Sequence, residues 1–239
     1  MSLIVGTAGW SIPSADAAQF GAGISALERY ASRLNGVEIN SSFYRPHRPT
    51  TWARWRDAVP AHFRFAVKLP KVISHERRLN DCAEPLGRFL DEVHTLNGKL
   101  AVLLLQLPPS LAFDKALVSD FFPMLTAATD ARVVCEPRHP SWFENDADAF
   151  LELLSVARVA ADPARVPAAA APGGWRGLSY WRWHGSPHIY RSSYDDGRLA
   201  ALSKSVRSER SPGTWCIFDN TAGPAATGNA LAMNDLLKA

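Results

Sequence analysis

The chain has 239 residues, of which 47% are hydrophobic and 21% are charged, and its formal net charge is +3. This composition is typical of a globular protein and excludes a largely disordered or collagen-like chain. No segment offers the roughly 20 apolar residues of a membrane-spanning helix, so we expect no membrane partner. The isoelectric point near 8.9 is mildly basic, and no block of lysines and arginines indicates a nucleic-acid-binding tail.

The cysteines and the first residues bear on the compartment. Cys82, Cys135 and Cys216 show no paired spacing. Isolated cysteines in odd number argue against a disulfide framework and predict a reducing environment, which we take to be the cytoplasm. The opening segment MSLIVGTAGW has neither a basic region nor a long apolar run, so it does not predict a signal peptide.

Eight short aliphatic or β-branched runs, each bounded by turn residues, predict eight β-strands. Their starts recur about every 30 residues, the length of one strand with its crossover helix. The predicted strands are residues 3–7, 36–40, 63–69, 100–107, 132–138, 157–162, 178–184 and 214–220.

Amphipathic patterns predict helices in most of the gaps between these strands. The gap at 163–177 is different, because it holds three prolines and three glycines and has no clear apolar face. We therefore expect the helix between the sixth and seventh strands to be short or missing. The other helices are expected at 24–34, 84–96, 114–128, 147–154, 197–206 and 228–238, with a further helix around Trp52 and Trp55.

Eight strands alternating with helices predict a (β/α)8 TIM barrel forming a single domain over residues 1–239. Several strands are apolar on both faces, as expected of parallel strands covered by helices. The alternative is an open doubly wound sheet. The segment GTAGWS after the first strand lacks the GxGxxG spacing that a dinucleotide-binding sheet of that kind carries.

Charged and polar residues stand at the carboxyl ends of the predicted strands. The segment VVCEPRHPSW (133–142), for example, runs from an apolar strand directly into Glu136, Arg138 and His139. In a TIM barrel these strand ends and the following loops form the mouth where active sites lie. The candidate mouth residues are Trp10, Glu38, Asn40, Lys68, His75, Gln106, Glu136, Arg138, His139, Trp142, Asp162, Arg182, His184, Asp219 and Asn220.

Two explanations account for this concentration of charge. Structural ion pairs, or strands simply leaving the core, would explain any single residue as well as a functional role does. Burying one such group alone costs several kcal/mol unless it is paired or used. Because most strands end this way, the set as a whole favours a functional site. Trp10, Tyr44 and Trp142, expected on mouth loops, would suit stacking on a sugar, nucleoside or nucleobase, although tryptophans in the strands are as well explained by packing.

Seven blocks of the sequence resemble a known family in the same order along the chain. They are GTAGWS (6–11), VEINSSFYR (37–45), FAVKLPKVISH (65–75), LLLQLPPS (103–110), CEPRHPSWF (135–143), YWRWHG (180–185) and IFDNTAGPAATGNA (217–230). The chain resembles the bacterial and archaeal family called domain of unknown function 72, the YecE-like TIM-barrel proteins. The resemblance implies the barrel and marks the same mouth blocks, but it implies no reaction.

The favoured functional hypothesis is acid–base catalysis, without a cofactor, on a small polar and anionic substrate such as a sugar phosphate or nucleotide. Lys68, Arg138 and Arg182 would hold phosphate or carboxylate. Glu136 or Glu38 would act as the general base and His184 as the general acid. The reaction class stays open among hydrolases, lyases and isomerases. Further substrate contacts would come from Asn40, His75, His139, Trp10, Trp142, Gln106, Asp219 and Asn220.

Two alternatives remain open. In the first, the chain is a divalent-metal-dependent hydrolase or isomerase with Glu136, Asp162 and Asp219 as metal ligands. Lysine and arginine among the ligands would repel a dication, which places this second. In the other, the chain binds a small molecule or a nucleic acid at a basic mouth without catalysis. The oligomeric state is left open by the sequence.

Overall fold

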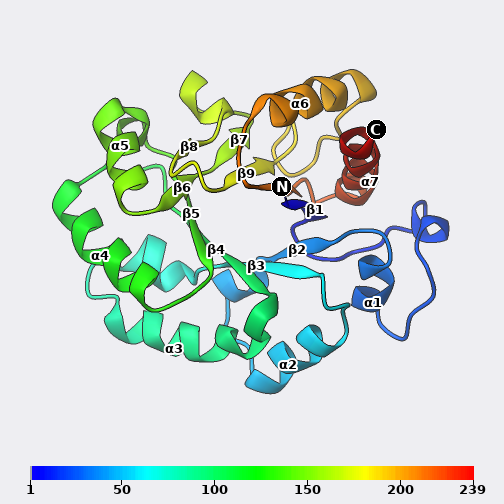
Figure 1. Cartoon of the computed structure of the whole chain (residues 1–239), viewed down its shortest axis with the longest axis horizontal. Helices are drawn as coiled ribbons and strands as arrows, with labels where there is room; N and C mark the ends of the chain where they lie inside the picture. The colour runs from blue at the N-terminus through cyan, green and yellow to red at the C-terminus, as the bar shows by residue number, and fades with distance from the viewer. Residues whose placement is uncertain (1) are drawn as a thin grey trace.

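The computed structural model describes residues 2–239. Its strands form a central barrel, and the helices that alternate with them along the chain lie around the outside (Figure 1). The barrel strands are β1 (Ser2–Thr7), β2 (Gly36–Ile39), β3 (Arg64–Lys68), β4 (Leu100–Gln106), β5 (Arg132–Glu136), β6 (Val156–Arg158), β7 (Ala160–Asp162), β9 (Ser179–Trp183) and β10 (Gly213–Phe218). The predicted TIM-barrel class is confirmed.

The barrel is made of two parallel sheets that meet at two seams. One sheet has the order β2-β3-β4-β5-β6 and the other β7-β9-β10-β1. The predicted sixth strand is divided at Val159, so that β6 pairs with β5 while β7 pairs with β9. Because β6 and β7 follow one another directly, this seam is closed by the chain itself.

The second seam, between β1 and β2, is held mostly by side chains. A single backbone bridge joins Ala8 to Glu38. The Asn35 amide replaces a strand partner by accepting from Val5 N at 3.0 Å and donating to Leu3 O at 2.7 Å. The two strands approach so closely that a Cβ on Gly6 would lie 2.1 Å from the carbonyl oxygen of Gly36. Glycine is therefore required at this seam.

Seven α-helices of the described chain follow one another around the strands in Figure 1. Serine and aspartate caps begin several of them: Ser25 and Glu28 form a capping box on α1, and Asp195 accepts from Arg198 N at the start of α6. The helices are α1 (Ala26–Ala31), α2 (Pro49–Asp57), α3 (Ala83–Val93), α4 (Lys115–Ala127), α5 (Asn145–Leu153), α6 (Asp196–Ser208) and α7 (Ala225–Lys238).

Short helical turns and one two-residue strand complete the connections. Between β7 and β9 the described chain forms only the 3-10 turn η6 (Pro167–Ala170) and β8 (Gly173–Gly174), which pairs antiparallel with β6. The expected short or missing helix is therefore confirmed. The remaining turns are η1 (Ala17–Gln19), η2 (Ser41–Phe43), η3 (Val72–Glu76), η4 (His94–Lys99) and η5 (Pro140–Phe143).

Alternation along the strands decides which residues reach the inside of the barrel. One buried cluster is built almost wholly from strand residues, among them Ala66, Leu104, Val134, Tyr180 and Ile217, and forms the barrel interior. Their strand neighbours belong to a larger cluster that packs under the helices. Since side chains alternate with a period of two, the next interior positions toward the mouth are Lys68, Gln106, Glu136, Arg182 and Asp219.

Two further observations bear on the sequence expectations. The three cysteines are free and buried. Within residues 2–239, no helix is both long and apolar enough to cross a bilayer.

Candidate functional site at the barrel mouth

Arg182 on β9 is the centre of the charged residues and is completely buried. Its guanidinium binds Glu38 in bidentate fashion, with Nε at 3.0 Å and Nη2 at 2.7 Å from the two carboxylate oxygens. It also donates to Glu136 through Nη1 and to Asp219 through Nη2, the latter at 2.8 Å. One cation thus joins carboxylates from three strands, β2, β5 and the end of β10.

Glu38 forms the deepest part of this arrangement. Its side chain is fully buried, and the Tyr180 hydroxyl donates to Oε2 at 2.9 Å beside the two bonds from Arg182. The carboxylate is therefore saturated with donors and shielded from a ligand. This geometry favours a positioning role for Glu38 over the general-base role expected from sequence.

His184, just beyond β9, lies between two carboxylates. Nδ1 is 3.0 Å from Asp219 Oδ2, and Nε2 is 3.2 Å from Glu136 Oε1. Burial lowers the pKa of His184, but the charge of Glu136 and these hydrogen bonds outweigh it and raise the pKa above its ordinary value. A carboxylate at each nitrogen favours the imidazolium form of the ring, in which both N–H groups donate.

The pKa values of the two carboxylates that contact His184 shift downward, opposite to that of His184. Burial raises the pKa of Glu136, but Arg182, His184 and Arg138 outweigh it and hold the pKa well below its usual range. The pKa of Asp219 is likewise lowered, because Arg182 and His184 overcome the effect of burial. Both groups are ionised at neutral pH, and a general base already occupied by several cations is a weak one.

Lys68, the last residue of β3, differs from the other buried cations. Its ammonium donates to Gln106 Oε1 at 2.7 Å and lies 4.1 Å above the centre of the Phe43 ring. Among residues 2–239 no carboxylate oxygen lies within 4.0 Å of Nζ. Burial, followed by the positive charge of Arg182, lowers the pKa of Lys68 to about 8, although the nearby carboxylates partly offset this.

Arg138 and Tyr190 lie at the outer edge of the same group. Arg138 donates to Glu136 Oε1 from Nε at 3.3 Å and from Nη2 at 3.2 Å, and 22% of its side chain remains exposed. Nη2 also lies 3.4 Å from the Tyr190 hydroxyl. Tyr190, which has a positive φ of 67°, places its ring edge-on to His184. Arg138 is thus the arginine of the group that solvent and a ligand can reach.

Hydrogen bonds connect these residues into one set, which we call the mouth network. Gln106 links its two sides, because its amide accepts from Lys68 and donates to Glu136 Oε1 at 3.0 Å. Asn40 donates to Asp219 at 3.4 Å. The mouth network comprises Glu38, Asn40, Lys68, Gln106, Glu136, Arg138, Tyr180, Arg182, His184 and Asp219.

The charges in the mouth network do not balance. With His184 as an imidazolium and Lys68 protonated, four cations face three carboxylates, each of which is bound to Arg182. The excess positive charge belongs to the side of the network that holds Lys68 and the partly exposed Arg138. His75 on η3 responds to both, since burial and then the charges of Lys68 and Arg138 lower its pKa.

Other predicted site residues have structural partners outside the network. Asn220 is buried and donates to Ser192 O and to Asn229, which fixes the loop after β9. Trp142 is fully buried, packs on Phe113 and donates to Leu111 O, so it is a packing residue and not a mouth aromatic. Trp10 packs edge-on against Trp55. His139 bonds to Ser141 at the start of η5, and His75 to Ser74.

The proposed metal ligands do not come together. Asp162 is adjacent to Trp183 in the β7–β9 pairing, on the face that packs under the helices, and its carboxylate pairs with Arg198 of α6. Glu136 and Asp219 are instead both bound to Arg182. Across residues 2–239, no group of three or more His, Cys, Asp or Glu side chains is arranged to hold a metal ion. The predicted ligand set of Glu136, Asp162 and Asp219 therefore does not assemble.

Three aromatic residues of the site were not predicted as such. Tyr180 lies two residues before Arg182, so the period-two rule could have placed its hydroxyl inside the barrel. Phe43 ends the short turn η2 after β2, and Tyr190 lies in the loop after β9, so neither position shows a periodic signal in the sequence. Their positions depend on the loop conformation alone.

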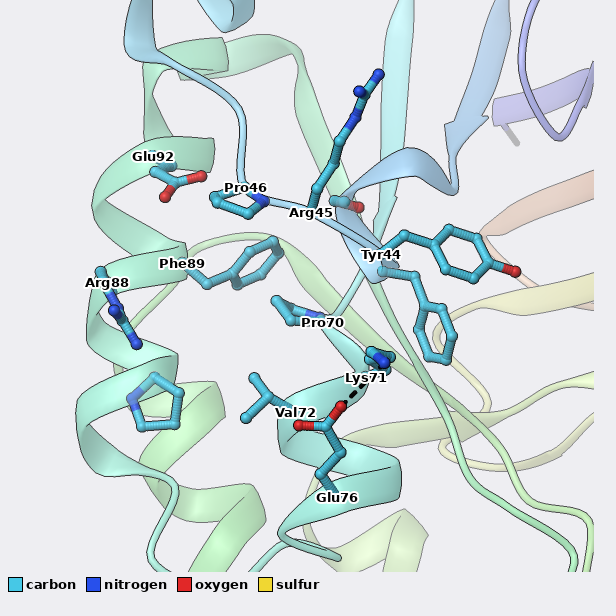
Figure 2. A pocket seen from close by; sticks show the side chains of 13 residues that line it. Tyr44, Arg45, Pro46, Pro70, Lys71, Val72, Glu76, Arg88, Phe89 and Glu92 are labelled. Carbon is cyan, nitrogen blue, oxygen red and sulfur yellow. Dashed lines mark ion pairs between the residues drawn. The ribbon is translucent and has the colours of Figure 1, made fainter.

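A cavity of about 280 Å³ lies beside the network, between η2, η3 and α3 (Figure 2). Its walls are largely apolar and include Pro46, Pro70, Val72 and Phe89, while an ion pair between Lys71 and Glu76 at 3.1 Å borders it. Phe43 lines this cavity and also contacts the ammonium of Lys68. The cavity and the network therefore share one aromatic side chain.

Comparison with known proteins agrees with this architecture. The model of the family described as protein of unknown function DUF72 matches residues 4–239. The chain belongs to the DUF72 family. UPF0759 protein YecE of Escherichia coli K12 is 31% identical over 121 residues, which are 51% of this chain and 44% of YecE. The matched segment thus spans less than half of that relative.

Two solved DUF72 family proteins have the same fold. The Enterococcus faecalis V583 protein superposes with a TM-score of 0.83 at 24% identity, covering 99% of this chain and 96% of its own. The Thermotoga maritima MSB8 protein gives a TM-score of 0.81 at 22% identity, with both chains covered completely. These likenesses establish the barrel and assign no reaction.

Proposed function

We propose that this DUF72 chain is an enzyme that performs acid–base catalysis on a small, polar and anionic substrate at the barrel mouth. The observation that supports the proposal is the excess positive charge of the mouth network. A buried cation without a carboxylate partner is costly, and proteins retain such groups where an anion or a reaction uses them.

The residues of the network divide into two roles. Arg138, with its partly exposed guanidinium, binds the phosphate or carboxylate of the substrate. Lys68 transfers the proton, because a pKa of about 8 lets it exchange protons near neutrality. Glu136, His184 and the other buried members hold these two groups in place and set their electrostatic environment.

A ligand-stabilisation experiment tests the proposal. Melting temperatures are measured with inorganic phosphate, sugar phosphates, nucleotides and divalent cations, each for the wild type, Arg138→Met and Arg54→Met. Arg54 is an exposed arginine on α2 outside the network and provides the matched control. A ligand at about 100 times its Kd adds ~2.7 kcal/mol of stability, or roughly 5 °C in a chain of this size.

We expect an anion to stabilise the wild type and the Arg54 variant but not Arg138→Met. Stabilisation that is equal in all three chains would overturn the anion site. Stabilisation by a divalent cation alone would support the metal-dependent alternative in its place.

A further inference from the structure

We propose that the substrate of this site is an aldehyde or ketone and that Lys68 binds it covalently as an imine. This rests on the proposed function, because it uses the same mouth and the same anchoring arginine. It goes further by naming the reacting group of the substrate and a nucleophile on the protein.

The surroundings of Lys68 suit a nucleophilic amine. Lys68 as a residue is 7% exposed, and the polar partner of its ammonium is the neutral amide oxygen of Gln106. The Gln106 amide is oriented by its own bond to Glu136, which directs Oε1 toward the lysine. A carboxylate in that position would hold the amine protonated, whereas an amide accepts one hydrogen bond and leaves the neutral form accessible.

Lys71 and Lys99 also have close polar partners, but they lack the combination of burial and a neutral side-chain partner. Lys71, three residues along the chain, pairs with Glu76 at 3.1 Å and is half exposed. Lys99 donates to the backbone oxygens of Arg56 and Val59 just before β4, at the opposite end of that strand from Gln106. Lys68 is thus distinguished by burial, by a neutral partner and by its place at the mouth.

The chemistry balances without a cofactor. The neutral Lys68 nitrogen attacks the carbonyl carbon, so that a C–N bond forms, the C=O π bond breaks and one proton moves from nitrogen to oxygen. A second proton, returned by the solvent to which Lys68 lost it on becoming neutral, then protonates this hydroxyl. The hydroxyl leaves as water while the C=N double bond forms, and the nitrogen keeps one proton and a positive charge. This iminium can still donate to Gln106 and face the Phe43 ring, so both contacts of the ammonium are preserved.

The charge of the site is also preserved. An iminium carries the same charge as the protonated lysine, so the network around Arg182 needs no rearrangement when the imine forms. Arg138 remains available for the anionic group of the substrate. The lowered pKa of Lys68, to about 8, supplies a far larger neutral fraction near neutrality than an exposed lysine has.

Reductive trapping tests the inference on the 239-residue chain. Glyoxylate, an anionic aldehyde, is added with sodium cyanoborohydride near pH 7.5, and peptides are mapped by mass spectrometry at short times. The hydride reduces the imine carbon and leaves a carboxymethyl group on the lysine nitrogen. We expect Lys68 to be labelled roughly tenfold or more faster than Lys71.

A conservative variant separates this inference from the proposed function. Lys68→Arg keeps the positive charge but cannot form an imine, so it should lose the label at position 68 and keep phosphate stabilisation. If wild-type Lys68 is labelled no faster than Lys71, the imine is overturned, whether or not the variant folds. Phosphate stabilisation that still depends on Arg138 would then leave the proposed function standing.

Discussion

The two sides of the mouth network handle buried charge in different ways. On one side, Arg182 is satisfied by Glu38, Glu136 and Asp219, and the group is closed to solvent. On the other side, Lys68 has only a neutral amide and an aromatic face. The first arrangement is typical of a structural ion-pair network, whereas the second leaves a charge for a ligand to complete.

This comparison distinguishes two roles of charged residues at a barrel mouth, one structural and one for binding a ligand. The saturated side positions strands and fixes side chains, and its removal should be felt mainly in stability. The unsaturated side should contribute little to stability or oppose it. Four substitutions test that division, in descending order of expected effect.

Replacing Arg182 should cause the largest loss of stability. Arg182→Met leaves three buried carboxylates without their shared cation, so we expect the free energy of unfolding to fall by about 3–5 kcal/mol or more. Urea unfolding measures it, with Arg54→Met as the exposed control. A decrease in the free energy of unfolding of less than about 1 kcal/mol would contradict the structural role of Arg182.

The second substitution, Glu136→Gln, removes one carboxylate from between Arg182 and His184. With Glu136 as a candidate general base, the sequence alone predicts that this change abolishes ligand binding or turnover and leaves folding intact. The structure instead predicts a loss of about 3 kcal/mol near neutral pH, because two buried cations lose their counter-charge.

The pH dependence of that loss follows from the lowered pKa of Glu136. Its stabilising contribution is present above the unfolded value of 4.5 and is lost as pH falls from there through the folded pKa. The difference between wild type and variant in urea unfolding should therefore shrink steadily as the pH falls below 4.5. A pH-independent difference would show that packing, and not charge, causes the effect.

Lys68→Met tests the unsaturated side and should have the opposite sign. Burial and Arg182 lower the folded pKa to about 8 from 10.5, whereas Glu136, Glu38 and Asp219 act against this shift. Below pH 8 both states bind the proton and the wild type bears the full penalty, which is relieved as pH rises toward 10.5. The stability advantage of the variant over the wild type should shrink by about 2–3 kcal/mol between pH 7 and pH 10. A constant difference in urea unfolding would contradict the depressed pKa.

The smallest effect on stability is expected for Tyr190, at the outer edge of the mouth network. Tyr190→Phe removes a hydroxyl that lies 3.4 Å from Arg138 on a partly exposed side chain. Thermal melts should show a change of about 0.5 kcal/mol, since water replaces the lost partner. A loss above about 2 kcal/mol would place Tyr190 among the structural residues of the network.

The fold and the location of the charges were predictable from the sequence. Strand runs at regular spacing indicate the barrel, and two-residue alternation correctly groups Glu38 with Asn40 and Arg182 with His184. Asp162 shows the limit of this reasoning. It ends a three-residue strand after a break at Val159, so its face is set by pairing with Trp183, which no local pattern reveals.

For a related reason, the sequence could not predict which charged residues of the mouth pair with one another. Every charged residue at the mouth could pair with several others, and the choice depends on side-chain geometry across strands distant in sequence. Glu38 and Arg182 are 144 residues apart, yet they form the deepest pair. The same uncertainty hid the fact that Lys68 has no acidic partner among the described residues.

Titration of Lys68 by NMR tests the distinction between the two sides most directly. The Cε and Hε signals of a ¹³C-labelled protein, assigned with Lys68→Arg, give the pKa of each lysine side chain. We predict that Lys68 titrates near 8 and that phosphate raises this value, because an anion favours the protonated form. A value at or above the ordinary 10.5, unchanged by phosphate, would show that Lys68 is a satisfied structural cation like Arg182.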